Sequence, residues 1–169
     1  MEFGVLYNQF QLQTLAYVVL AMLLGAVIGI DREIADKPAG LRTHMLVCGA
    51  STLLVSLGDI MVRHFDQNLP NNMLQSDPIR IIEAVITGVS FLGAGTIIRR
   101  GSDNIAGLTT AASILFVAAV GICVALSQIS LAMGSTVLVV IILRGVHLLQ
   151  QWMGLQHQKK DTEKSKQDG

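Results

Sequence analysis

Charge is scarce in this chain, because only 14% of its 169 residues are Asp, Glu, Lys or Arg. In soluble domains about a quarter of the residues are charged, so this composition argues against a soluble domain. Apolar residues make up 51% of the chain and fall into long blocks. Long apolar blocks with few charges are typical of a protein that crosses a membrane.

Cysteine is equally scarce, and the usual catalytic motifs are missing. Cys48 and Cys123 both lie inside apolar blocks, with no CxxC or Cys/His spacing. We therefore expect packing residues and neither a disulfide nor a zinc site. The sequence also lacks a nucleophile elbow, a phosphate loop, HExxH and a dinucleotide fingerprint. These absences predict a protein that is not an enzyme and that needs no cofactor.

The first eleven residues, MEFGVLYNQFQ, contain no Lys or Arg. A cleavable signal peptide begins with a basic segment, so we expect the first apolar block to remain in the mature protein. Five apolar blocks follow one another, each about long enough to cross the hydrocarbon core as a helix. They predict an all-α membrane protein with five transmembrane helices, over residues 12–30, 43–61, 79–98, 105–126 and 129–149.

The domain organisation follows from these blocks. Residues 1–11 form an external N-terminal lead, residues 12–150 the transmembrane domain, and residues 151–169 a polar tail that we expect to be disordered and cytoplasmic. With the N-terminus outside, ten of the twelve Lys and Arg residues lie on the inner side, against Arg63 and Arg80 outside. The positive-inside rule therefore predicts a multi-pass protein of the bacterial inner membrane with a cytoplasmic C-terminus.

Six charged residues gather in one loop, GIDREIADKPAGLRTH over residues 29–44. A second charged loop, RRGSDN, occupies residues 99–104. The triplet LGA precedes each loop at residues 24–26 and 92–94, and AGL occurs late in the first loop, at residues 39–41, and just after the second, at residues 106–108. Spans one and three cross the membrane in the same direction, so the pattern predicts a parallel internal repeat of helices 1–2 and 3–4 whose two loops meet.

These motifs, together with GVSFLGAGTIIRRG and IAGLTTAASILF, resemble the MgtC/SapB family of bacterial inner-membrane proteins. The resemblance covers about residues 12–150 and implies five membrane helices with an external N-terminus. It implies a regulator linked to adaptation to low magnesium, which binds membrane complexes such as the ATP synthase. Many members carry a C-terminal ACT-like domain, and this chain is expected to be a short form without it.

The candidate site residues lie mainly where the two loops meet. We expect a functional loop interface that is formed by Asp31, Arg32, Arg42, Thr43, Arg99, Arg100, Gly107 and Thr109. Asp31 ends the first helix, where its charge opposes the helix dipole, so it needs a cation such as Arg32, Arg42, Arg99 or Arg100. It forms either a charge-pair latch or a solvated interfacial carboxylate. Asp31 and Glu33 are also weak candidates for a magnesium site, which the neighbouring arginines disfavour.

A polar stripe runs along the third span, where Arg80, Glu83, Thr87 and Ser90 share one helix face. It forms either a polar cavity open to the outside or an interfacial Arg80–Glu83 pair. Small residues line one face of the fourth span and favour close packing, inside the bundle or between the chains of a homodimer. His44 is expected at the membrane interface.

Three functions stay open. The first is a non-enzymatic regulator that binds partner membrane proteins, and the second is a transporter or channel for magnesium or another cation. The third is a structural oligomer that senses ions through its loops. Few acids lie within the spans, and a magnesium conductor needs more acidic or carbonyl-rich lining, so the composition favours the regulator. Nucleic acid is not expected as a partner.

Overall fold

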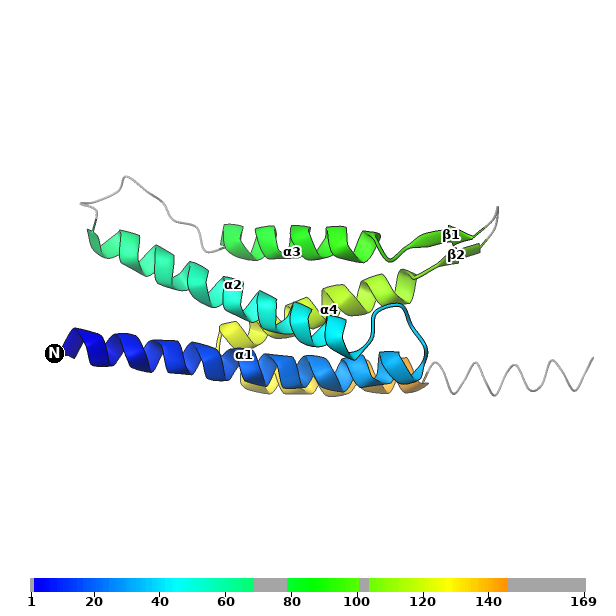
Figure 1. The fold of residues 1–169 in the computed structure, drawn as a ribbon, viewed down its shortest axis with the longest axis horizontal. Coiled ribbons are helices and arrows are strands. Elements are labelled where there is room, and N and C mark those ends of the chain that lie inside the picture. The colour runs from blue at the N-terminus through cyan, green and yellow to red at the C-terminus, as the bar shows by residue number, and fades with distance from the viewer. Residues whose placement is uncertain (1, 69–78, 101–103, 146–169) are drawn as a thin grey trace, which may run out of the picture.

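The computed structural model describes residues 2–68, 79–100 and 104–145, and the side-chain surroundings of residues 10–62, 79–97 and 106–145. Five helices and one short hairpin make up these residues (Figure 1). The elements are α1 (Glu2–Ile34), α2 (Leu41–Asn68), α3 (Ile79–Ala94), β1 (Ile98–Arg100), β2 (Asn104–Ala106), α4 (Leu108–Ala125) and a fifth helix (Ile129–Gly145).

The helices confirm the expected class, an all-α membrane protein. In the described part of the chain, three segments are long and apolar enough to cross a bilayer, namely Phe10–Ile34, Leu41–Val62 and Leu108–Ala125. The fifth helix is apolar but shorter, and α3 has 16 residues. Many large apolar side chains point outward, such as Leu12 at 69% exposure and Ile141 at 64%, as a lipid-facing surface requires.

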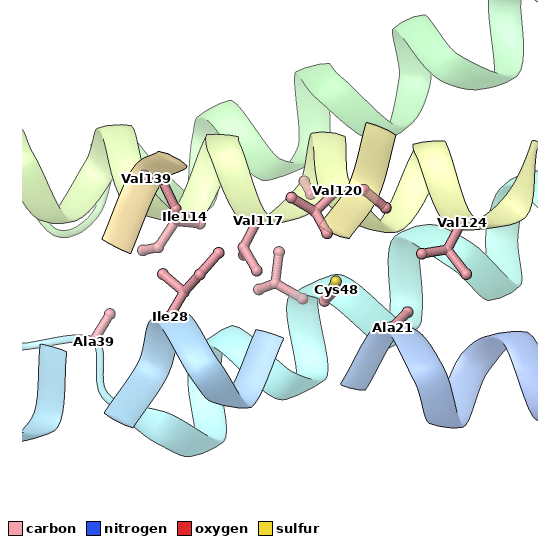
Figure 2. Close-up of a cluster of buried hydrophobic side chains, with 12 residues drawn as sticks. Ala21, Ile28, Ala39, Cys48, Ile114, Val117, Val120, Val124 and Val139 are labelled. Carbon is pink, nitrogen blue, oxygen red and sulfur yellow. The ribbon is translucent and has the colours of Figure 1, made fainter. Parts of the chain in front are cut away.

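The centre of the bundle is the crossing of α2 and α4. α1 lies along α2, the fifth helix lies beside α1, and α3 covers the other side (Figure 1). Side chains from four helices fill the core, with Ile28 from α1, Cys48 from α2, Val117 from α4 and Val139 from the fifth helix (Figure 2). The first three of these side chains are completely buried.

Gly121 allows the backbones of α2 and α4 to approach closely where the two helices cross. A Cβ atom at Gly121 would collide with the backbone carbonyl of Cys48 and would lie 3.1 Å from the Cβ of Ser51. The buried hydroxyl of Thr52 donates a hydrogen bond of 2.8 Å to the carbonyl of Gly121. The absence of a side chain thus brings the two backbones together, and a hydroxyl links them, as is typical of helix pairs in membranes.

The helix ends differ from the sequence-based bounds. α1 begins at Glu2, inside the expected lead, and α3 ends at Ala94, four residues before the expected end at 98. Thr96 stops α3 because its amide and hydroxyl both donate to the carbonyl of Gly93, at 2.9 and 2.7 Å. The expected tail at 151–169 lies outside the described residues.

A two-stranded hairpin replaces the expected charged loop after α3. β1 and β2 pair antiparallel, with Ile98 opposite Ala106 and Arg100 opposite Asn104. α4 then begins at Leu108 and not at the expected residue 105. Gly107 allows this path because its φ of 96° lies in the left-handed region, and a Cβ there would collide with the carbonyl of Thr96.

Equivalent contacts in the two halves favour the predicted repeat. The expected alignment matches Gly25 with Gly93 and His44 with Ala111. A Cβ on Gly25 would lie 2.6 Å from the carbonyl oxygen of His44, and a Cβ on Gly93 would lie 3.4 Å from that of Ala111. Each glycine on the first helix of its pair therefore faces the same position on the second, and the repeat itself stays a prediction.

Candidate functional site at the loop end of the bundle

Three segments that are distant in sequence lie at the same end of the bundle, which we call the loop end. They are the turn between α1 and α2 at residues 35–40, the β1–β2 hairpin and the last turn of the fifth helix (Figure 1). The fifth helix reaches this end through Arg144, whose side chain contacts Asp31 on α1. The loop end therefore gathers most of the residues that the sequence nominated.

A charge cluster of Asp31, Arg32 and Arg144 is the centre of the loop end. Arg32 donates from Nη2 and Nε to Oδ2 of Asp31, at 2.6 and 3.2 Å. Arg144 donates from Nε to Oδ1 at 3.0 Å. The side chains of Asp31 and Arg32 are only 9% and 5% exposed, whereas that of Arg144 is 61% exposed. The cluster is thus a buried ion pair with a second, half-exposed cation.

Two arginines balance the negative charge of Asp31. A carboxylate in the last turn of a helix lies next to unpaired backbone carbonyls, so a cation must offset its charge. Here two guanidinium groups each bind a different carboxylate oxygen, and charge-assisted hydrogen bonds of this kind are the strong ones. Asp31 is therefore a paired, buried carboxylate and not a solvated one.

Glu33 has a separate structural role two residues later. Its Oε2 accepts a hydrogen bond of 2.7 Å from the backbone amide of Leu41, the first residue of α2. A carboxylate at a helix N-terminus pairs a free amide and offsets the positive end of the dipole. The turn between the helices closes tightly, with Asp36 at a φ of 52° and the amide of Lys37 bonded to the carbonyl of Arg32 at 3.0 Å.

His44 anchors the first turns of α2 and α4 to each other. The ring is fully buried, with Nδ1 at 2.8 Å from the carbonyl oxygen of Gly40 and Nε2 at 3.1 Å from Oγ of Ser113. Oγ of Ser113 also lies 2.8 Å from the carbonyl oxygen of Thr110, so its single proton serves either that oxygen or Nε2 of a neutral ring. Because the Gly40 oxygen can only accept, Nδ1 must carry a proton. The expectation of an interfacial His44 is wrong, since the ring is a core hydrogen-bonding group.

The other nominated residues lie at the same end but outside the cluster. Arg42 and Thr109 are exposed, Thr43 is half-buried and Gly107 lies under the hairpin, against Thr96. Arg99 and Arg100 belong to β1, and their side chains lie outside the described residues.

The weak magnesium candidates do not form a metal site within the described ranges. No group of three or more His, Cys, Asp or Glu side chains converges there. Asp31 is held by two arginines, and Glu33 is bound to the amide that starts α2. Their carboxylate oxygens therefore already serve other groups, although Mg²⁺ requires such oxygens as ligands.

Sequence reasoning missed the third member of the charge cluster. Arg144 was not among the expected partners of Asp31, from which it is separated by 112 intervening residues. One signal could have found it, because Arg144 follows a long apolar run in the fifth segment. An arginine beside such a run usually has a specific partner.

In the part of the chain that the structure describes, the polar stripe faces outward. α3 packs inward through Ile82, Val85, Val89 and Gly93, and Arg80, Glu83, Thr87 and Ser90 are exposed on another face. The described residues therefore give no support to the expected polar cavity, which stays a prediction. A cavity of about 310 Å³ does open at the far end of the bundle, but α1, α2 and the turn after α4 line it, including Tyr17, Ser56 and Ser127.

Fold and site together define a small helical membrane protein whose charged groups concentrate at one end. The sequence profile of the MgtC family matches residues 18–152, and the chain belongs to this family. SapB of Bacillus subtilis is 38% identical over 103 residues, which cover 61% of this chain and 43% of SapB. MgtC of Salmonella typhimurium is 36% identical over 125 residues, 72% of this chain and 47% of MgtC.

A third relative carries a functional name. The Escherichia coli protein named "Putative magnesium transporter YhiD" is 36% identical over 132 residues, which cover 78% of this chain and 60% of that protein. The match thus spans about half of the length of these curated relatives. No solved structure gives a significant match.

Proposed function

We propose that this chain is a non-enzymatic membrane regulator that binds partner membrane complexes through its loop end and takes part in adaptation to low magnesium. One observation carries this proposal: the buried acid at the loop end, Asp31, is neutralised inside the chain, while Lys37 and Arg42 beside it are exposed. Buried charges at this end hold the fold, and exposed ones remain for a partner. By family resemblance, the ATP synthase is the partner that we propose.

The interior of the single chain supports a binding protein more than a conductor. Ile28, Ile114 and Val117 fill the centre of the bundle and are completely buried (Figure 2). Ion pathways are lined by carbonyl rings, charged rings or polar side chains. In the part of the chain that the structure describes, buried hydroxyls such as Thr52 and Thr136 instead donate to backbone carbonyls at 2.8–3.0 Å.

Partner capture tests the regulator role. We expect the double variant Lys37→Glu/Arg42→Glu, in membranes that contain the ATP synthase, to retain about a tenth of the wild-type amount of captured synthase, because reversing rim charges slows association. The control is Gln128→Glu, which adds a negative charge in the turn after α4. Equal capture by the double variant and the control, with both folded, would contradict binding through the loop end.

A second candidate function, transport of magnesium or another cation, is favoured by the name of YhiD alone. Proteoliposomes that hold a magnesium-sensitive dye distinguish the two. The regulator proposal expects no flux above that of empty liposomes from inserted, folded protein. Saturable flux that Glu83→Gln abolishes in folded, inserted protein would instead establish a pathway and overturn the regulator-only proposal.

We also propose that the loop end faces the cytoplasm of a bacterium and that the chain lies in the inner membrane with its N-terminus outside. Lys37 and Arg42 at this end support that orientation by the positive-inside rule. In intact cells, a membrane-impermeant maleimide should leave Lys37→Cys unlabelled and label Gln128→Cys, since these residues lie at opposite ends. The reverse pattern would invert the orientation.

A further inference from the structure

The outer face of α3 is polar and points away from the bundle. We define this α3 outer face by Arg80, Glu83, Thr87, Ser90 and Phe91, all of which are exposed. The inward face of the same helix is taken by Val85, Val89 and Gly93. Ionisable groups on membrane helices usually face protein or water and not hydrocarbon, so this face calls for a protein neighbour.

We propose that the α3 outer face packs against the same face of a second copy of this chain. Arg80 and Glu83 lie three residues apart, about 4.5 Å along the helix axis at 1.5 Å per residue. In a two-fold dimer with parallel α3 helices, Arg80 of each copy lies near the depth of Glu83 of the other. The face is thus complementary in charge to itself, as an isologous interface requires.

The surroundings of the α3 outer face leave its charges and its aromatic ring available to a neighbouring chain. Neither Arg80 nor Glu83 forms an ion pair within the described ranges, so both charges can pair across the two-fold axis. Phe91 is 85% exposed, the highest value among the large apolar residues whose burial the structure describes, and buried aromatic anchors dominate many interfaces. A Cβ on the neighbouring Gly88 would meet no atom within 4 Å, which leaves room for a close approach.

The structure also excludes the surface that the sequence suggested for a dimer. The small residues Ala118 and Gly121 of α4 are buried inside the chain, and Gly121 contacts α2. That packing face is therefore already occupied. The homodimer that we propose uses α3 in its place.

Crosslinking in membranes tests the contact. Thr87→Cys should form a covalent dimer under mild oxidation, with a yield at least tenfold above that of Val137→Cys. Val137 is a matched control because it lies within the fifth helix and is 58% exposed. The native cysteines serve as background in the wild-type chain. Equal yields from the two variants would overturn the proposal, as would dimers formed by Val137→Cys alone.

Charge reversal tests the pairing itself. Arg80→Glu alone and Glu83→Arg alone should each lower the dimer yield of Thr87→Cys about tenfold, because each places four like charges at one interface. The double reversal Arg80→Glu/Glu83→Arg should restore the yield. A double variant no better than either single variant would overturn the proposed pairing, and unchanged yields in all three would show that the charges face lipid headgroups and not a second copy.

Discussion

Replacing Asp31 with alanine should destabilise the folded chain by about 3–5 kcal/mol, the usual cost of removing one partner from a buried ion pair. Arg32 would lose its carboxylate while only 4% of its surface reaches solvent. Thermal unfolding of the purified protein in detergent measures the effect. A thiol-reactive dye gives the readout, because Cys48 is fully buried in the native fold and becomes accessible on unfolding.

Arg144→Gln is the matched control for this prediction. Its side chain is 61% exposed, so its bond to Asp31 should contribute only about 0–1 kcal/mol. Removing both charges of the buried pair, as in Asp31→Asn/Arg32→Gln, should recover part of the loss, since no unpaired charge then remains. A melting temperature for Asp31→Ala equal to that of Arg144→Gln would show that the buried pair does not stabilise the loop end.

Gly121→Leu should prevent the native packing of α2 against α4. Even the first added carbon would collide with the carbonyl of Cys48 and lie 3.1 Å from Ser51, and both contacts are with well-packed parts of α2. Inserting atoms into a well-packed core typically costs about 1–3 kcal/mol, and occasionally more. Because the contact is backbone to backbone, we expect the upper end of this range and loss of the Thr52–Gly121 hydrogen bond.

Gly134→Ala is the control for this substitution. Gly134 also lies in an apolar helix, but a Cβ there would meet no atom within 4 Å. Alanine is the better helix former and should add up to about 1 kcal/mol to the free energy of unfolding. The melting temperature should therefore stay unchanged or rise. If Gly121→Leu and Gly134→Ala unfold at the same temperature, the close α2–α4 crossing is not required for the fold.

The apolar blocks predicted the class of the fold because hydropathy alone distinguishes a membrane helix. They did not predict where each helix ends. α3 stops at Ala94 because the carbonyl of Gly93 accepts two hydrogen bonds from Thr96, which is a local geometry that hydropathy does not detect. The turn at Gly107 and the hairpin before it have the same origin.

The candidate site was only partly predictable for a related reason. Asp31 could be identified because a charge at the end of an apolar helix is conspicuous in one sequence. The contacts of Asp31 with Arg144 and of His44 with Ser113 join residues that are more than 60 positions apart. The periodicity of a sequence does not predict such long-range contacts. The sequence also did not show which face of α3 points into the bundle. A polar stripe shows which residues share a face, but not whether that face contacts protein, water or lipid.

The fifth helix is joined to α1 at both ends, by Arg144 with Asp31 and by Ser127, just before it, with Tyr17 at 3.2 Å. These bonds have a consequence for biosynthesis. During synthesis α1 leaves the ribosome first and the fifth helix leaves last. Only then does Asp31 gain Arg144 as its second cation, and only then is the side of α1 covered. Until then Arg32 alone balances Asp31. Translation that stops before residue 129 would therefore leave an inserted intermediate with an uncovered α1 surface, a natural substrate for membrane quality-control proteases.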